Sequence, residues 1–419
     1  MKNARFVKAF FFAALIILPS SVFTFDFGIT ANINMGYGND KTGIDTFDFK
    51  ADLWPRFSLP IGDKAEFFIS AGLAFSTTEH ELFVPELLRT DFSVRFGNAG
   101  IRLGRMNYTD PLSLIASGLF DGIQFYFNSD IGKLSAGAWY TGFLYKSSAN
   151  ITMTDNDLFV FAKPFAFDDS YLASKRLIAA LEWDHPSFKD LLHLNAAVIF
   201  QFDLNEVIKE YVKQTGEDAN YVKKYNNQYI MIKAGIPLND FLFEAGGALE
   251  LSQTETVNDS QFSAAFAGDF NAAWMLPVNI NSRLSFIGKI AGGKIKNSSI
   301  TEFTPITTKY FGNILKHKMS GLSLFGLNYT ARINREIAAT VTASYFIRND
   351  LGTFTGYPNP GDNDGYFLGP EIFARAIWSP LSDMQINLGG GAFFPSLGDA
   401  GPDAKVRWRV ELTATLSLF

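Results

Sequence analysis

The chain ends in the stretch AKVRWRVELTATLSLF, from Ala404 to Phe419, and this stretch decides the fold. Every second residue in it is apolar, namely Val406, Trp408, Val410, Leu412, Ala414, Leu416 and Leu418. The residues between them are charged or carry a hydroxyl group, from Lys405 to Ser417. Because side chains alternate between the two faces of a strand, the pattern predicts a β-strand with one apolar and one polar face.

The same alternation recurs along the chain upstream of this tail and fits no helical period. It is clearest from Phe25 to Tyr37, where the odd-numbered residues are apolar and the even-numbered residues are small or polar. In full, the pattern predicts about 18 strands (16–18) in an all-β chain. They cover residues 25–37, 47–59, 65–75, 87–96, 99–106, 122–127, 132–144, 176–184, 191–203, 228–236, 241–252, 261–275, 280–291, 322–333, 336–348, 366–378, 384–394 and 404–419.

The connections between these strands alternate between short and long. Short turns such as Gly97-Asn98 and Asn334-Arg335 alternate with long segments such as 145–175 and 292–321. Short turns at one rim and long loops at the other are typical of a transmembrane antiparallel β-barrel with short periplasmic turns and long extracellular loops.

The distribution of charge separates such a barrel from a soluble β-sandwich. A Lys or Arg on the lipid face of a barrel costs roughly 2–4 kcal/mol at the membrane midplane. On the apolar face of the predicted strands, Arg105 is the only charged residue. The opposite face carries both signs, including Asp48, Lys50, Glu244 and Arg375. The sequence therefore predicts an apolar outside and a wet, charged bore.

The first residues predict export. Lys2, Arg5 and Lys8 precede an apolar run at 9–18, so residues 1–24 are expected to be a signal peptide and 25–419 the barrel domain. Removing residues 1–24 takes away three positive charges and no acid, so the net charge of −6 becomes −9. This acidic balance argues against nucleic acid as a partner. The absence of cysteine excludes disulfides, thiolate metal sites and cysteine nucleophiles.

The amphipathic last strand, with its aromatic carboxy-terminal residue, resembles the closing strand of the bacterial outer-membrane porin-like β-barrel family. The resemblance implies a location in the bacterial outer membrane and pairing of the last strand with the first. A barrel of 16–18 strands is too wide for its wall side chains to fill, so it leaves an aqueous channel unless a loop or plug obstructs it. No plug domain stands between residue 24 and the first predicted strand.

The third long loop, predicted at 107–121, is the candidate constriction. Gly104-Arg105 at the end of the fifth strand resembles the porin arrangement in which such a pair starts a loop that folds into the lumen. The run from Pro111 to Ala116 is unusually apolar for a loop in water. Folding against the inner wall would hide it, and so would packing on neighbouring loops at the rim.

If this loop enters the lumen, Asp110 would face a group of positive residues on one sector of the wall. A field across the pore would then select small, polar or anionic solutes. The alternative is that these charges only solvate the bore, since acids are interspersed among them. The predicted pore-lining residues are Lys50, Arg56, Arg89, Arg95, Arg102, Asp110, Arg407 and Arg409.

The sequence favours a passive channel over an enzyme. Its four histidines are far apart in the chain, and no catalytic or metal-binding motif is present. No cofactor or metal is expected. The predicted function is a porin for small polar or anionic solutes, with membrane lipid as its surroundings and a homo-oligomer as a possible state. The alternative is a receptor or adhesin that binds through its long loops and has an occluded lumen.

Overall fold

The architecture comes from a computed structural model. It describes residues 25–418 except 40–42, 78–82, 162–170, 189–190, 206–221, 257–258, 279, 296–298, 351–364 and 401–403. The signal peptide predicted at residues 1–24 therefore lies outside the described residues.

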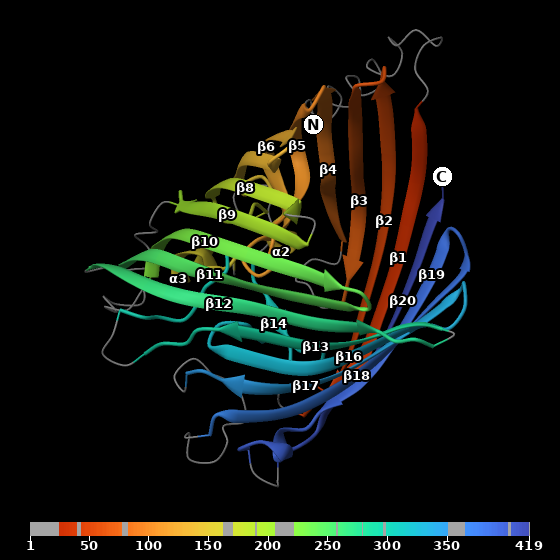
Figure 1. Ribbon diagram of the computed structural model, residues 1–419, viewed down its shortest axis with the longest axis vertical. Helices are drawn as coiled ribbons and strands as arrows, with labels where there is room; N and C mark the ends of the chain where they lie inside the picture. Colours follow the sequence, from red (N-terminus) through yellow and green to blue (C-terminus); the bar gives the residue numbers. More distant parts are fainter. Residues whose placement is uncertain are drawn as a thin grey trace.

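One sheet of 18 strands forms the molecule (Figure 1). Its strands are β1 (Asp26–Asn39), β2 (Asp45–Ile61), β3 (Ala65–Ser76), β4 (Phe83–Phe96), β5 (Ala99–Thr109), β6 (Ser117–Ser129), β7 (Gly132–Tyr140), β8 (Arg176–Phe188), β9 (Leu192–Asp203), β10 (Val222–Leu238), β11 (Phe241–Thr256), β12 (Ser260–Met275), β13 (Asn281–Ala291), β16 (Leu322–Arg332), β17 (Ile337–Arg348), β18 (Phe367–Leu381), β19 (Met384–Phe393) and β20 (Arg407–Leu418).

The sheet closes on itself. Each strand is antiparallel to its neighbour along the chain, and the last strand, β20, pairs with the first, β1, from Ile29↔Leu418 to Gly38↔Arg409. Figure 1 shows β1 and β20 side by side where the red and blue ends of the chain meet. The predicted all-β antiparallel barrel of about 18 strands is confirmed, as is the pairing of the carboxy-terminal strand with the first.

The side chains follow the predicted parity. The apolar face of each strand points outward, so Leu53, Phe125, Leu181 and Ile230 are exposed although they are large and apolar. Aromatic rings lie near the strand ends on this face; Tyr37 and Trp408 pack edge to face with ring centroids 5.3 Å apart. This surface suits hydrocarbon with an aromatic belt at its border.

Short turns join the strands at one rim, here called the turn end, and loops join them at the other, the loop end. Three loops matter below: L3 (110–116), L4 (141–175) and L7 (292–321). L3 is shorter than the segment 107–121 predicted from the sequence, because β5 and β6 stay paired up to Thr109↔Ser117.

The loops contain the remaining secondary structure. L4 carries α2 (Lys146–Ala149) and α3 (Asp155–Phe161), and L7 carries the small hairpin of β14 (Tyr310–Phe311) and β15 (His317–Lys318). A 3-10 helix, η1 (Pro395–Leu397), follows β19. None of the helices in the described part of the chain is long and apolar enough to cross a membrane.

Candidate functional site

The tip of the β5–β6 hairpin leaves the wall and turns into the bore. Pairing of β4 with β5 ends at Thr90↔Arg105, and pairing of β6 with β7 ends at Asp121↔Tyr140. Above these points β5 and β6 pair only with each other. Gly104 makes the bend with a φ of +111°, and a Cβ at this position would clash with the carbonyl oxygen of Thr90. Glycine is therefore required where the strand turns inward.

L3 continues this inward path and reaches the opposite part of the wall. The Leu112 side chain occupies the space in front of Gly246, on the inward face of β11. The Asp110 carboxylate fixes the loop by accepting hydrogen bonds from the backbone N–H groups of Leu112 (2.9 Å), Ile115 (2.9 Å) and Ala116 (2.8 Å). The structure thus places L3 in the lumen rather than at the rim.

L7 is the second loop that enters the bore, and it packs on L3. Backbone N–H of Thr307 donates to the Ile115 carbonyl (3.1 Å), and the Thr307 hydroxyl accepts from N–H of Ser117 (2.9 Å). Sequence reasoning did not place this loop in the lumen, because loop length alone does not show where a loop folds.

Two wall carboxylates anchor L7 on opposite sides. Glu250 of β11 accepts a hydrogen bond from N–H of Thr304 (2.7 Å) and another from the hydroxyl of Tyr225 (2.9 Å). Glu371 of β18 accepts from three successive N–H groups, at residues 313, 314 and 315, over 2.7 to 3.0 Å. L7 is therefore fixed to the wall at β11 and at β18.

L4 covers L3 and L7. N–H of Thr152 donates to the Ile306 carbonyl (2.9 Å), and N–H of Thr308 donates to the Asn150 carbonyl (2.8 Å). Arg176 on β8 holds L4 to the wall by pairing with Asp157 of α3 and with Asp203 of β9, where the second ion pair is 2.7 Å long. A buried apolar cluster joins the three loops to the wall and includes Leu112, Ile115, Trp139, Ile151, Phe303, Ile306 and Leu315.

The other side of the bore is charged and faces water. Arg89 and Arg102 share the Asp91 carboxylate at 2.5 and 2.7 Å, so this group of three residues keeps one positive charge. Arg409 pairs with Asp48 at 2.7 Å, and Arg375 pairs with Glu411 at 2.7 Å. Lys50 lies 3.9 Å from Asp52, and its side chain is 42% exposed.

The remaining predicted site residues have different surroundings. The Arg56 guanidinium lies across Gly28 of β1, and Arg95 is exposed near the turn end of β4. Arg407 is buried at the loop end of β20. Asp110 is 2% exposed and turned toward its own loop, so it shapes L3 and does not line open water opposite the arginines.

Lys316 at the tip of L7 is a candidate that the sequence did not reveal. It is exposed, adopts a left-handed backbone with φ of +44°, and lies within electrostatic range of Arg409, Glu411 and Asp48. Burial of part of its side chain and, next, repulsion by Arg409 lower the pKa of Lys316 below its ordinary value. L7 therefore places a cation within electrostatic range of Arg409 on β20.

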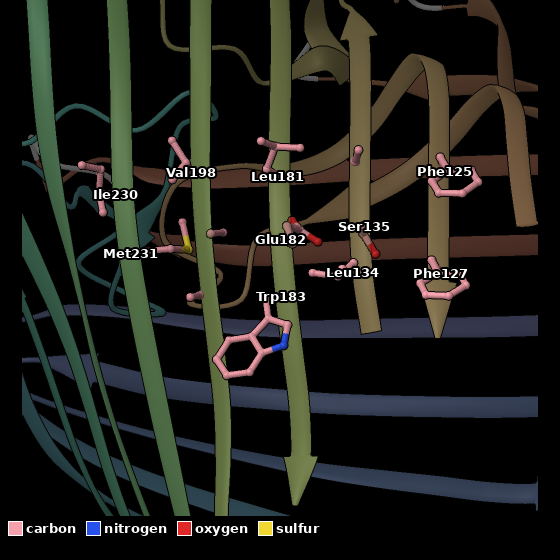
Figure 2. A pocket seen from close by; sticks show the side chains of 13 residues that line it. Phe125, Phe127, Leu134, Ser135, Leu181, Glu182, Trp183, Val198, Ile230 and Met231 are labelled. Atoms are coloured by element: carbon pink, nitrogen blue, oxygen red, sulfur yellow. The ribbon is translucent and has the colours of Figure 1, made fainter. Parts of the chain in front are cut away.

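An apolar groove marks the outer face of β6–β10 (Figure 2). Phe125, Leu181, Trp183 and Ile230 stand around it, and the short side chains of Ala136 and Ala196 leave it hollow. Because these residues have the outward parity, the groove faces lipid and does not belong to the channel. No group of three or more acidic or histidine residues suited to a metal ion occurs in the described part of the chain.

Solved structures of bacterial porins share this fold. OccK2 (OpdF) of Pseudomonas aeruginosa superposes with a TM-score of 0.60 at 12% sequence identity, covering 94% of this chain and 97% of that chain. The same protein in complex with glucuronate gives a TM-score of 0.59 at 12% identity, covering 94% and 96%. A BenF-like porin from Pseudomonas fluorescens Pf-5 gives 0.59 at 10% identity, covering 94% and 98%.

These matches confirm the resemblance to outer-membrane porin-like barrels at the level of fold. No protein-family model matches the chain, and no curated protein matches its sequence.

Proposed function

We propose that this protein is a channel of the bacterial outer membrane through which small polar solutes diffuse, with a preference for anions. The barrel has an apolar exterior and a charged interior, as a channel protein needs in a membrane. The fold is that of porins whose solved structures include a complex with glucuronate, a small carboxylate. We extend only the chemical class, small carboxylates, to this chain and do not propose glucuronate itself as its solute.

One observation carries the preference for anions: positive groups face the passage from two sides. Lys316 projects from L7, while Arg375 and Arg409 line the wall at β18 and β20. The wall acids Asp48 and Glu411 are already engaged by these two arginines. Because Arg375 and Arg409 neutralise these two acids, the group on the wall carries no net charge, and Lys316 gives the passage one net positive charge. We infer the preference for anions from this net charge, because fixed charge of one sign along a pore selects ions of the other sign.

The positive residues of the neighbouring strands extend the proposed path. Arg89 and Arg102 with Asp91 keep one net positive charge, and Arg56 and Arg95 lie on the same sector of wall. A solute carboxylate could pass between guanidinium groups, which bind carboxylates in two-pronged geometry. We propose these residues, with Lys50 and Arg409, as the lining of the path.

The purified protein added to a planar lipid bilayer tests the proposal. Stepwise increases in ionic conductance are expected, together with swelling of protein-containing liposomes in solutions of small sugar acids. The competing possibility is a surface receptor whose lumen is sealed by L3, L4 and L7. A bilayer that stays silent at high protein concentration would favour this receptor and reject the channel.

A loop deletion separates the two functions further. Removing most of 292–321 takes away the L7 tip with Lys316. A channel should then conduct more current with weaker selectivity, whereas a sealed receptor would lose partner binding. As a matched control, shortening the loop after β19 leaves L7 in place and should preserve the selectivity of the channel.

A further inference from the structure

The inward turn of the β5–β6 tip leaves a slot in the barrel wall. Residues 83–89 of β4 pair with β3 on one side, but β5 is no longer their neighbour on the other side. At about 3.3 Å per residue, the edge left open is roughly 20 Å long. An open strand edge is not tolerated in contact with hydrocarbon, because its backbone groups would lack partners. Another segment must therefore cover this edge.

Part of L4 covers the slot and is called the panel, residues 143–149 and 171–173. The panel is held together internally by a bridge between Tyr145 and Leu172 and by a hydrogen bond from N–H of Lys146 to the carbonyl of Tyr171 (3.0 Å). The rings of Tyr145 and Tyr171 pack against each other in a tilted arrangement, with centroids 4.9 Å apart. These contacts hold the two parts of the panel together.

Side chains provide the bonds that hold the panel against β4. The Tyr171 hydroxyl donates to the Pro85 carbonyl (2.7 Å), and the Ser148 hydroxyl donates to the Glu86 carboxylate (2.8 Å). Arg105 bridges both edges, since its guanidinium donates to the carbonyls of Leu87 and Phe143. No strand pairing joins the panel to β4 in the residues that the structure describes. Among the described residues, side-chain hydrogen bonds and not a backbone ladder therefore join the panel to β4.

The seam carries apolar side chains on both faces, beside the polar groups that hold it closed. On the outside, Phe83 and Phe143 are 68% and 63% exposed, and Leu87 stands between them on the β4 edge. On the inside, Val84, Met106 and Leu144 are buried against the loops. The base of the slot is closed by the ion pair of Arg105 and Asp121 (2.8 Å), which explains the one charged residue on the outward face of the predicted strands.

We propose that this seam is a side portal, closed by the panel at rest, through which amphipathic solutes pass between the outer leaflet and the lumen. The apolar side chains suit the body of such a solute, and the polar groups of the seam suit its head group. The panel would swing away from β4 by breaking the few side-chain hydrogen bonds that hold it in the described residues. The portal is a route separate from axial diffusion of polar solutes. Failure of either proposal is therefore visible without failure of the other.

A reversible cross-link tests the portal, and the absence of cysteine in the natural chain makes the chemistry selective. Glu86→Cys and Ser148→Cys are introduced together and joined by a short, reducible bis-methanethiosulfonate linker. Two readouts are compared: salt conductance in a planar bilayer, and entry of anilinonaphthalene sulfonate into protein-containing liposomes loaded with serum albumin. This probe is an aromatic amphiphile that partitions into the leaflet and fluoresces on albumin.

The linker is expected to reduce probe entry to the lower rate that axial diffusion of this anion alone supports, while conductance is unchanged, and reduction of the linker should restore the faster entry. The control is Thr330→Cys with Thr340→Cys, two facing positions of β16 and β17 that are already paired. Linking these two should affect neither readout. Probe entry that the Glu86–Ser148 linker leaves unchanged, or that falls only in proportion to conductance, overturns the portal.

A single substitution decides the question if the double variant fails to assemble. Tyr171→Phe removes one hydrogen bond of the seam and keeps the ring that packs against Tyr145. Probe entry should rise while salt conductance stays the same. An unchanged rate of probe entry in this variant contradicts the proposal.

Discussion

Two parts of the inner wall carry ionic side chains, and these parts differ in what lies over them. On the covered wall, which comprises the loop ends of β8–β11, Arg176 and Glu250 are 0% exposed beneath L4 and L7. On the open wall, which comprises β18–β20 and β1–β5, the side chains of Lys50 and Arg375 are 42% and 44% exposed. The same inward parity thus produces buried anchors on the covered wall, whereas the open wall combines water-facing charges with buried groups such as Glu371.

The difference shows that inward charge alone does not identify a pore-lining residue. Removing one partner of a buried ion pair lowers the free energy of unfolding strongly, because the other charge stays buried without water or a counter-charge. Removing one partner of an exposed ion pair changes stability little, since water and salt ions replace that partner. Stability should therefore respond to changes in the covered wall, and ion selectivity to changes in the open wall.

The largest effect is expected from Arg176→Ala, which leaves Asp157 and Asp203 as buried acids without a cation. Loss of one partner from a buried ionic group costs about 3–5 kcal/mol. The matched change on the open wall, Arg375→Ala, should cost about 0–1 kcal/mol, because that pair is largely exposed. Thermal unfolding in detergent, followed by circular dichroism, measures both. Equal losses would remove the distinction between the two walls.

A smaller effect is expected from Glu371→Ala, where the open wall anchors L7. The substitution leaves the N–H groups of residues 313, 314 and 315 without their acceptor, and a buried unsatisfied donor costs about 1–3 kcal/mol. L7 should detach at this end, so single-channel recordings should show added current fluctuations. Glu371→Gln keeps one acceptor oxygen and should show fewer current fluctuations than Glu371→Ala. A steady current in the alanine variant would show that L7 is held by other contacts.

The sharpest effect on selectivity is expected from Lys316→Glu. This change reverses one charge within electrostatic range of Arg409 and turns a repulsion between the two side chains into an attraction. The permeability ratio of anions to cations should fall severalfold, while thermal stability is unchanged. Arg95→Glu, at the exposed turn end of β4, is the control and should have a weaker effect. If the permeability ratio of anions to cations is the same in the natural protein and in Lys316→Glu, the solute does not pass Lys316.

The smallest effect is a pH dependence of selectivity that arises from the same lysine. The pKa of Lys316 is lowered by burial and by Arg409, so its positive charge is lost at a lower pH than that of an ordinary lysine. Anion preference should therefore decline as the pH rises into the alkaline range, and it should decline before free lysines titrate. The measurement is the zero-current potential as a function of pH. In Lys316→Met the anion preference should be lower and should change less with pH. A decline that persists in Lys316→Met would assign the titration to another group.

The strands were predictable from the sequence because alternation of side chains is a local property. The 18 segments, the closing role of Ala404–Phe419 and the inward placement of Lys50, Arg102 and Arg409 all follow from a period of two. Polar side chains at the inner face are required by an aqueous bore, and their positions can be read residue by residue.

The paths of the loops were not predictable in the same way, because they depend on contacts between distant segments. Asp110 was expected in the pore lining, but its position depends on how L3 folds around its carboxylate. Lys316 was missed because its place within electrostatic range of Arg409 requires anchoring of L7 by Glu250 and Glu371, far away in the chain. For L3 the sequence did offer one signal, because Gly104-Arg105 resembles the pair that starts an inward-folding loop in porins.

The zero-current potential across a planar bilayer in a salt gradient tests the central claim most directly. That claim is a water-filled bore whose open wall and L7 tip present cations to the solute. The account predicts stepwise conductance and a zero-current potential with the sign expected for an anion-selective channel. In Lys316→Glu this potential should shift toward the value expected for a cation-selective channel. A sealed bilayer, or a cation-selective current that is indifferent to this substitution, would contradict it.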